Sequence, residues 1–99
     1  MNTATADRLL ERLETNRHLA LLRCCSTIEQ RTTNEIADAA AKLTGLSGQA
    51  SYRSVGLRLS HLARRELVEG LKRDGSPIMW LLTGRGLAVL QRAHETGRV

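Results

Sequence analysis

The sequence predicts a single, mainly α-helical domain with one small β-hairpin. The chain has 99 residues and an ordinary hydrophobic fraction of 41%, but it contains no Phe, one Trp and one Tyr. Its core must therefore be built mainly from Leu, Ile, Val and Ala, a composition that favours helices. The hairpin is indicated by Asp74-Gly75, a strong turn signal, between two apolar runs.

Two amphipathic helices are predicted near the N-terminus. The first, over 4–14, has apolar side chains at positions i, i+3, i+4 and i+7, namely Ala6, Leu9, Leu10 and Leu13. The second, over 17–28, repeats this spacing with Leu21, Cys24, Cys25 and Ile28. Periodicity leaves open whether Thr15-Asn16 interrupts one long helix or separates two, and Asn16 is a candidate cap. The stripe of the first helix packs either on its own domain or against a second subunit.

A third helix is predicted over 32–43 because Thr32 and Glu35 have the spacing of a capping box. In that motif the threonine hydroxyl accepts from the glutamate amide, and the carboxylate accepts from the threonine amide. The apolar stripe of this helix consists of Ile36, Ala40 and Leu43. Gly45 is expected to end it, and a turn over 44–49 follows.

The next helix, over 50–65, has an apolar and a polar side. With residues 100° apart and Val55 at its centre, the core side also holds Leu59, Leu62 and Glu66, with Ser51 and Tyr52 at its edges. The outward side collects Arg53, Leu57, Ser60, His61 and Arg64, flanked by Ser54 and Arg58. Long basic side chains on such a side can reach phosphates and the acceptor edge of guanine. Leu57 is the exception, and it either contacts a thymine methyl group or indicates a surface that meets protein.

After Glu66 the apolar period changes to that of strands, which predicts a hairpin over 67–82. With a two-residue loop at Asp74-Gly75, one side of the second strand holds Ile78, Trp80 and Leu82 and the other holds Met79 and Leu81. Lys72 and Arg73 then lie at the hairpin tip. Thr83 is the expected cap of a last helix over 84–95, with Leu87, Leu90 and His94 along one side and His94 at the surface.

The basic charge is concentrated in the C-terminal half of the chain. Residues 1–49 contain six Lys or Arg and six Asp or Glu, which cancel, so the net charge of +5 arises in residues 50–99, with nine against four. This asymmetry localises a candidate phosphate-binding surface to the half with the basic helix and the hairpin. The alternative is a generally basic surface.

Several classes of protein are disfavoured. The only cysteines, Cys24 and Cys25, are neighbours that cannot easily bridge, so we expect two core residues and a reducing compartment. No ligands at recognised spacing accompany His18, so we expect neither a metal nor a cofactor. Paired carboxylates, a Gly-rich phosphate loop and an activated nucleophile are all missing, so we expect no enzyme. A polar N-terminus and no apolar run of about 20 residues predict a cytoplasmic protein.

Residues 17–90 resemble the winged helix-turn-helix superfamily, particularly small bacterial regulators of the MarR and PadR kind. The resemblance rests on helix 32–43, the run Val55-x-x-x-Leu59-x-x-Leu62-x-x-x-x-Leu67-Val68 and the hairpin end Trp80-x-Leu82-Thr83-x-x-Gly86. Such families often have a Gly where this chain has Glu66. The resemblance implies a winged helix-turn-helix with extra N- and C-terminal helices, in which residues 51–64 enter the major groove of DNA and 72–76 form the wing.

The resemblance also implies a homodimer on a pseudo-palindromic operator, held by helices 4–14 and 85–95. The expected dimer contacts are Leu9, Leu10, Leu13, Leu87 and Leu90. The predicted function is therefore sequence-specific binding of double-stranded DNA by a homodimeric transcriptional regulator, with the wing on the adjacent minor groove or backbone. The predicted DNA contacts are Ser51, Arg53, Ser54, Leu57, Arg58, Ser60, His61, Arg64, Lys72 and Arg73.

Two alternatives remain open. A close relative is a plasmid or phage protein that binds partition or replication sites with the same surface. The alternative of a different class is a winged helix that binds protein, as an adaptor or a phage-encoded inhibitor. Leu57 on the outward side and the two-sided apolar strand 78–82 favour this second alternative.

Overall fold

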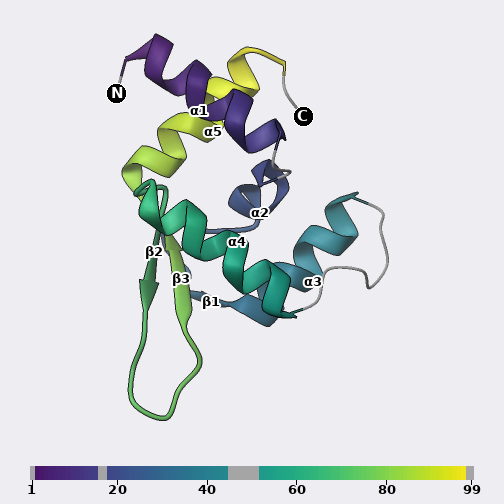
Figure 1. Cartoon of the computed structure of the whole chain (residues 1–99), viewed down its shortest axis with the longest axis vertical. Coiled ribbons are helices and arrows are strands. Elements are labelled where there is room, and N and C mark those ends of the chain that lie inside the picture. The colour runs from purple at the N-terminus through teal and green to yellow at the C-terminus, as the bar shows by residue number, and fades with distance from the viewer. Residues whose placement is uncertain (1, 16–17, 45–51, 98–99) are drawn as a thin grey trace.

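The computed structural model describes residues 2–15, 18–44 and 52–97, which form five helices and three strands. In chain order these are α1 (Thr3–Thr15), α2 (Leu19–Arg23), β1 (Arg31–Thr32), α3 (Thr33–Thr44), α4 (Tyr52–Arg64), β2 (Val68–Leu71), β3 (Met79–Leu82) and α5 (Gly84–Glu95). The fold is mostly helical, with a small antiparallel sheet in which β3 lies between β1 and β2. Figure 1 shows α1 and α5 packed together at one end and the β2–β3 hairpin extending from the other.

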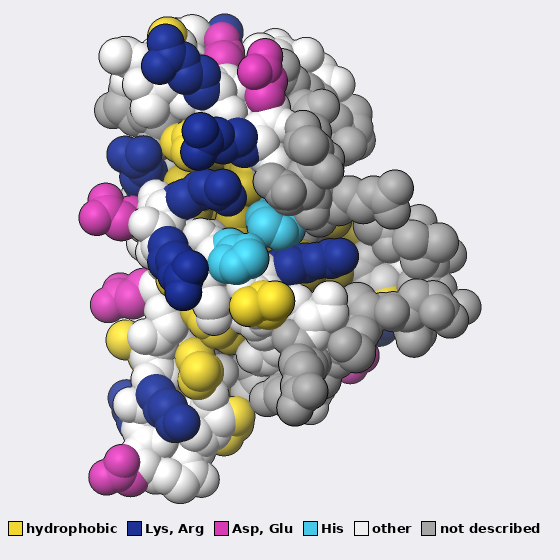
Figure 2. Space-filling view, viewed as in Figure 1, with side chains coloured by type: hydrophobic (Ala, Val, Ile, Leu, Met, Phe, Trp, Pro, Cys, Tyr) yellow, Lys and Arg dark blue, Asp and Glu magenta, His cyan; other side chains and the backbone are white. Residues whose placement is uncertain are grey.

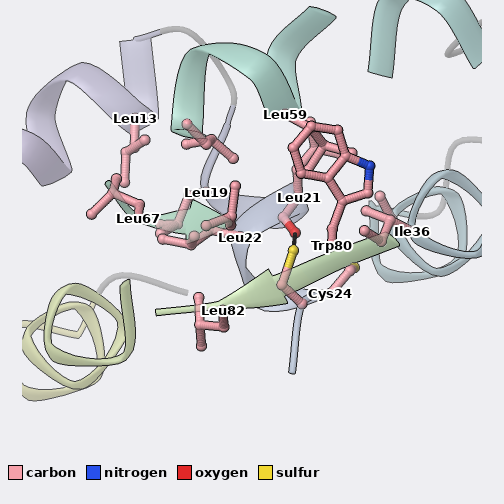
Figure 3. Packing of buried hydrophobic residues seen from close by; sticks show 14 of the residues in the cluster. Leu13, Leu19, Leu21, Leu22, Cys24, Ile36, Leu59, Leu67, Trp80 and Leu82 are labelled. Atoms are coloured by element: carbon pink, nitrogen blue, oxygen red, sulfur yellow. Dashed lines mark hydrogen bonds between the residues drawn. The ribbon is translucent and has the colours of Figure 1, made fainter. Parts of the chain in front are cut away.

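The core is aliphatic and includes one tryptophan on the central strand. Trp80 is 3% exposed, and its indole Nε1–H donates to the hydroxyl of buried Thr33 at 2.9 Å. Figure 3 shows Trp80 beside Leu59 of α4 and near Ile36 of α3. A buried indole N–H normally finds such a partner, because leaving it unbonded costs free energy. Trp80 therefore ties β3 to the start of α3 as well as packing against α4.

Two helix starts have the caps that the sequence predicts. The Thr32 hydroxyl accepts from the Glu35 amide at 3.2 Å, and the Glu35 carboxylate accepts from the Thr32 amide at 3.0 Å. This second bond lowers the pKa of Glu35 below its usual value. At α5 the Thr83 hydroxyl accepts from the Gly86 amide at 3.0 Å. Both caps satisfy amides that have no partner inside the helix.

Glu66, which stands at a position where a Gly is common, lies just after the end of α4. Glu66 has φ +62°, in the left-handed region that favours glycine. The Leu67 amide donates to the Leu62 carbonyl at 3.1 Å, and the Glu66 amide donates to the Ala63 carbonyl at 3.0 Å. These two bonds form a Schellman motif, with Leu62 and Leu67 fully buried together beneath it. The prediction that Glu66 lies on the core side of the helix is wrong, because the helix has already ended there and the side chain is exposed.

Replacing Glu66 with glycine should stabilise the protein by about 1 kcal/mol, because the strain of a side chain at positive φ is removed. The free energy of unfolding in urea measures this. Glu69→Gly, on exposed β2, is the matched control and should lower stability, because a strand glycine has more conformational entropy to lose on folding. If both variants lose stability equally, the left-handed geometry at Glu66 is not strained.

The N-terminal helices are separate, and the second is shorter than predicted. α1 ends at Thr15 and α2 begins at Leu19, while Asn16 lies outside the described residues. The predicted helix over 17–28 ends at Arg23 because Ser26 forms a local turn instead: its hydroxyl accepts from the amides of Ile28 and Glu29, at 3.1 Å each. Ile28 is consequently 88% exposed and is not part of the apolar stripe.

The sheet contains a strand that the sequence analysis does not predict. β1 pairs with β3 through Arg31 opposite Trp80 and Thr32 opposite Met79. Ahead of it, the Ser26 carbonyl accepts from the Leu82 amide at 2.8 Å, which extends the contact between this segment and β3. A strand of two residues is too short to show an alternating pattern, so periodicity gives no signal for it.

The hairpin has its turn where predicted but a longer loop. The Ser76 amide donates to the Arg73 carbonyl at 3.0 Å, and Gly75 has φ +75°, so Asp74-Gly75 forms the centre of the turn. The strand pairing, however, ends at Leu71 opposite Met79, so the condition of a two-residue loop is not met. A two-residue loop would place Arg73 opposite Ser76, one residue out of this register. Residues 72–78 therefore project beyond the sheet as an extended loop (Figure 1).

α5 packs with a different side than predicted. Its buried residues are Gly86, Val89 and Ala93, whereas Leu87 is 39% exposed. Leu90 is half-buried against the core, and His94 is exposed as predicted. The prediction assigns the larger apolar side chains, beginning with Leu87, to the inward side of the helix. The structure instead turns small residues inward, because the helix lies close to α1 and to the backbone of Leu67 ahead of β2.

Candidate nucleic-acid interface

The core positions of α4 determine which of its residues reach the surface. Val55, Leu59 and Leu62 are fully buried, so the helix is fixed in rotation about its axis. Leu57 is then 60% exposed and Arg64 is exposed. The other described members of the predicted DNA contacts on this helix are half-buried: Ser54, Arg58, Ser60 and His61. Ser51 and the side chain of Arg53 lie outside the described part of the chain.

The half-buried members differ in how free they are to reach a ligand. The Ser60 hydroxyl donates to the Gly56 carbonyl at 3.0 Å, within its own helix. Arg58 and His61 lie one helical turn apart or less on one flank of α4, next to His18 from the start of α2. The exposed face of α4 thus offers Arg64 and Leu57 outward, with Arg58 and His61 at its side.

The hairpin loop supplies two further cations. Lys72 and Arg73 are exposed at its tip, beside exposed Asp74. Figure 2 shows Lys and Arg side chains over the part of the molecule where Figure 1 has α4, and again at the hairpin. The helix and the loop therefore present positive charge on the same face.

The cations of this face are not neutralised by acidic neighbours. Among the described side chains, the ion pairs join Arg31 to Glu29 and Arg92 to Asp7 and Glu95, all away from α4. None of the described carboxylates forms an ion pair with the described Lys and Arg side chains of α4, of the residue directly after it or of the hairpin, which are Arg58, Arg64, Arg65, Lys72 and Arg73. Positive charge that is left unpaired on one face attracts polyanions.

Two residues near this face are missing from the sequence-based set. His18 is 5% exposed, and the centroid of its ring lies 6.1 Å from that of His61. Arg65, directly after α4, is half-buried, and its charge acts on His18. Burial and the charges of Arg58, Arg65 and His61 lower the pKa of His18 below 6.5. No pattern along the chain relates His18 to α4, because only the folded structure brings them together.

The described residues contain no group of three or more His, Cys, Asp or Glu side chains that could hold a metal ion. Burial raises the pKa of Cys25 to about 12 and also raises that of Cys24, so both thiols are protonated at neutral pH. A protonated, buried thiol is a poor nucleophile.

The predicted dimer contacts are divided by the structure. Leu10 and Leu13 are 0% exposed within the single chain, so they have no surface with which to contact a second copy. Within the chain the α1 stripe packs on its own domain, which is one of the two arrangements that its sequence leaves open, and there the Arg92 guanidinium also meets the Asp7 carboxylate at 2.9 Å. Leu9 and Leu90 are half-buried and Leu87 is 39% exposed, so these three retain accessible surface.

The described helices include none that is both long and apolar enough to cross a membrane. The arrangement is a basic helix face and a basic hairpin loop, held on one side of a small helical domain. Comparison of the chain with protein-family models, with curated proteins and with solved structures finds no match.

Proposed function

We propose that this chain is a winged helix-turn-helix protein that binds double-stranded DNA, with α4 as the recognition helix and the β2–β3 hairpin as the wing. The observation that carries the proposal is the set of unpaired cations shared by α4 and the hairpin loop. The fold proposal rests on the order β1, α3, α4, β2, β3 and on the position of β3 between β1 and β2. In this arrangement a helix and a loop can enter adjacent grooves of one duplex.

In the proposed complex the exposed face of α4 lies in the major groove. Arg64 is placed to contact a guanine edge or a phosphate, and Leu57 to contact a thymine methyl group. Lys72 and Arg73 lie on the neighbouring backbone or minor groove, where they set the orientation without reading sequence. Each neutralised phosphate releases counterions, so affinity should fall steeply as salt rises.

Removing one exposed cation from either element should weaken DNA binding. We expect Arg64→Ala and Arg73→Ala each to lower affinity about tenfold at low salt, and to reduce the slope of log affinity against log salt by about 1. Fluorescence anisotropy with mixed genomic fragments at several salt concentrations measures both quantities. For Arg64→Ala the loss of affinity should be greater on a DNA sequence selected for binding than on mixed fragments, because a base contact is lost in addition to the phosphate contact.

The matched control is Arg8→Ala, which removes the same charge from exposed α1, at the opposite end of the molecule from the hairpin (Figure 1). It should change affinity by less than about twofold, because net charge alone acts weakly at that distance in salt. Equal losses of DNA affinity for all three variants, or no DNA binding by the unmodified protein at low salt, would contradict the proposal.

A homodimeric, cytoplasmic transcriptional regulator is the biological role that we propose for this activity. The accessible surface left on α1 and α5, with Leu9, Leu87 and Leu90, is the proposed dimer contact. A dimer of this kind reads two half-sites about one helical turn apart. Selection of bound fragments tests the role, since a palindrome supports it, whereas direct repeats indicate a partition or replication site.

Exposed Leu57 favours a second candidate function, binding to an acidic protein partner. A leucine that is 60% exposed in the middle of a basic face resembles the apolar centre of an interaction surface with a charged rim. Leu57→Ser separates the two functions. In the DNA assay it should leave the salt slope unchanged, because no phosphate contact is removed. In an assay of binding to an acidic protein it should abolish binding, because the apolar centre of the surface is lost.

A further inference from the structure

Four nitrogen-bearing side chains gather where α2 meets α4, and we call them the His18 cluster: His18, Arg58, His61 and Arg65. The two imidazole rings lie 6.1 Å apart and are tilted by 47°. Arg58 and Arg65 are close enough for their charges to act on His18. Figure 2 shows two histidine side chains next to each other with Lys and Arg side chains around them.

The backbone holds His18 in place from both sides. Its amide donates to the Leu13 carbonyl of α1 at 2.8 Å, and its carbonyl accepts from the Leu22 amide of α2 at 3.0 Å. The residue is 5% exposed. The cluster is therefore built on a fixed backbone and does not depend on a mobile surface side chain.

Two buried nitrogen atoms of the cluster have no hydrogen-bond partner, namely His18 Nδ1 and Arg65 Nη1. Buried polar atoms are almost always satisfied in folded proteins, so two of them in one cluster call for an explanation. The charges make the arrangement more costly still, because all the charges that act on His18 from the described residues are positive. An isolated group of like charges is unfavourable unless an ion of opposite charge joins it.

We propose that the His18 cluster is a binding site for a phosphate group. A phosphate presents several acceptor oxygens, which suit two guanidinium groups and imidazole N–H donors. Its negative charge would offset the repulsion within the cluster, and a small shift of His18 and Arg65 would direct their unpartnered atoms to its oxygens. The phosphate comes either from a DNA backbone next to α4 or from a small phosphate compound. With DNA as the source the site rests on the proposed DNA binding, and with a small phosphate compound it does not.

The chemistry of His18 makes phosphate binding dependent on pH. In the folded protein the pKa of His18 lies below 6.5, first because of burial and then because of Arg58, Arg65 and His61. The unfolded chain therefore binds more protons as pH falls through 6.5, and stability is lost in that direction. A bound phosphate favours the protonated imidazole and raises this pKa. Phosphate should accordingly stabilise the protein more at pH 6 than at pH 8.

Thermal unfolding with inorganic phosphate tests the site directly. At constant ionic strength, replacing chloride by phosphate at ten times its Kd should raise Tm by about 5 °C or more at pH 6 and by less at pH 8. His18→Phe and Arg65→Gln should lose this increase, and His94→Phe, an exposed histidine on α5, should keep it. An increase that all variants keep is a general salt effect and would overturn the proposal.

Because His18→Phe replaces a buried residue, two measurements do not depend on its folding. His61→Phe and Arg58→Gln alter half-buried members of the cluster and should each reduce the phosphate effect. In the unmodified protein, NMR titration of the imidazole C–H signals should show that phosphate raises the pKa of His18, with the signals of exposed His94 as the control. Equal shifts for both histidines would overturn the proposal.

A second arm distinguishes the two sources of phosphate. If inorganic phosphate has no effect but Arg65→Gln lowers DNA affinity and reduces the salt slope by about 1, the site takes a backbone phosphodiester. If phosphate stabilises the protein and Arg65→Gln leaves DNA binding unchanged, it takes a small phosphate compound. If phosphate does not stabilise the protein and Arg65→Gln does not weaken DNA binding, the proposed site is wrong, even when Arg64→Ala shows that the protein binds DNA.

Discussion

Gly86→Ala should destabilise the protein by about 3 kcal/mol or more, because the added methyl group has no space. A Cβ at this position would overlap the carbonyl oxygen of Leu67 and would lie 2.6 Å from Leu82 Cδ1. The carbonyl belongs to the backbone at the end of α4, so it cannot move aside as a flexible side chain would. Separating α5 from it would disturb β2 and β3 as well. Small domains have a total stability of about 5–15 kcal/mol, so this single methyl group would remove a large share of it.

Gly84→Ala is the matched control, since it makes the same change in the same helix. A Cβ at Gly84 would meet nothing within 4 Å. Alanine there should be neutral or should stabilise the protein by about 0.5 kcal/mol, because it lowers the entropy of the unfolded chain. Chemical unfolding of both variants provides the comparison. Stabilities for Gly86→Ala and Gly84→Ala within about 0.5 kcal/mol of each other would show that α5 does not pack this closely.

Leu13→Ala should cost about 3 kcal/mol, because it removes apolar atoms from the core and leaves a cavity there. Leu13 is 0% exposed, and Figure 3 shows it above Leu19 of α2 and Leu67, which lies between α4 and β2. The destabilisation should appear as a lower midpoint in urea. It should not depend on protein concentration, because the side chain packs within one chain and not between two.

Leu57→Ala is the control for this prediction, because it removes the same atoms from a side chain that is 60% exposed on α4. It should change stability by less than about 0.5 kcal/mol. A loss of stability in Leu13→Ala that depends on protein concentration more than the stability of the unmodified protein does would mean that Leu13 packs against a second subunit, contrary to its burial in the single chain.

Prediction from the sequence succeeds wherever a local motif or a strong helical period decides the structure. The caps at Thr32 and Thr83 and the turn at Asp74-Gly75 depend on residues close together in the chain, and each lies at its predicted position. The core side of α4 follows from the spacing of its large aliphatic residues. These features need no knowledge of the tertiary fold.

Prediction fails where contacts between distant segments decide the structure. The short α2 and the two-residue β1 exist because the segment after Arg23 forms hydrogen bonds with β3. No local sequence pattern predicts that pairing. The inward side of α5 is decided by how close its backbone comes to Leu67, which makes Gly86 more important than the larger Leu87. Periodicity depends on which side chains are large and hydrophobic, so it cannot predict how closely the backbone of α5 approaches Leu67.

The candidate site shows the same division. Leu57 and Arg64 can be assigned to the surface from the period of α4 alone, and both are exposed. The same period gives no reason to include Arg65, and His18 belongs to a different segment of the chain. Their association depends on the packing of α2 against α4, so it can be found only from the fold.

The bonds of Thr83 have a mechanical consequence. Its hydroxyl donates to the Glu66 carbonyl at 2.6 Å and accepts from the Gly86 amide, while its own amide donates to the Leu67 carbonyl at 3.1 Å. One residue thus joins the end of α4, the chain entering β2 and the first turn of α5. Because all three bonds belong to one residue, a displacement of the first turn of α5 would pull on the end of α4 and on the chain entering β2 at the same time.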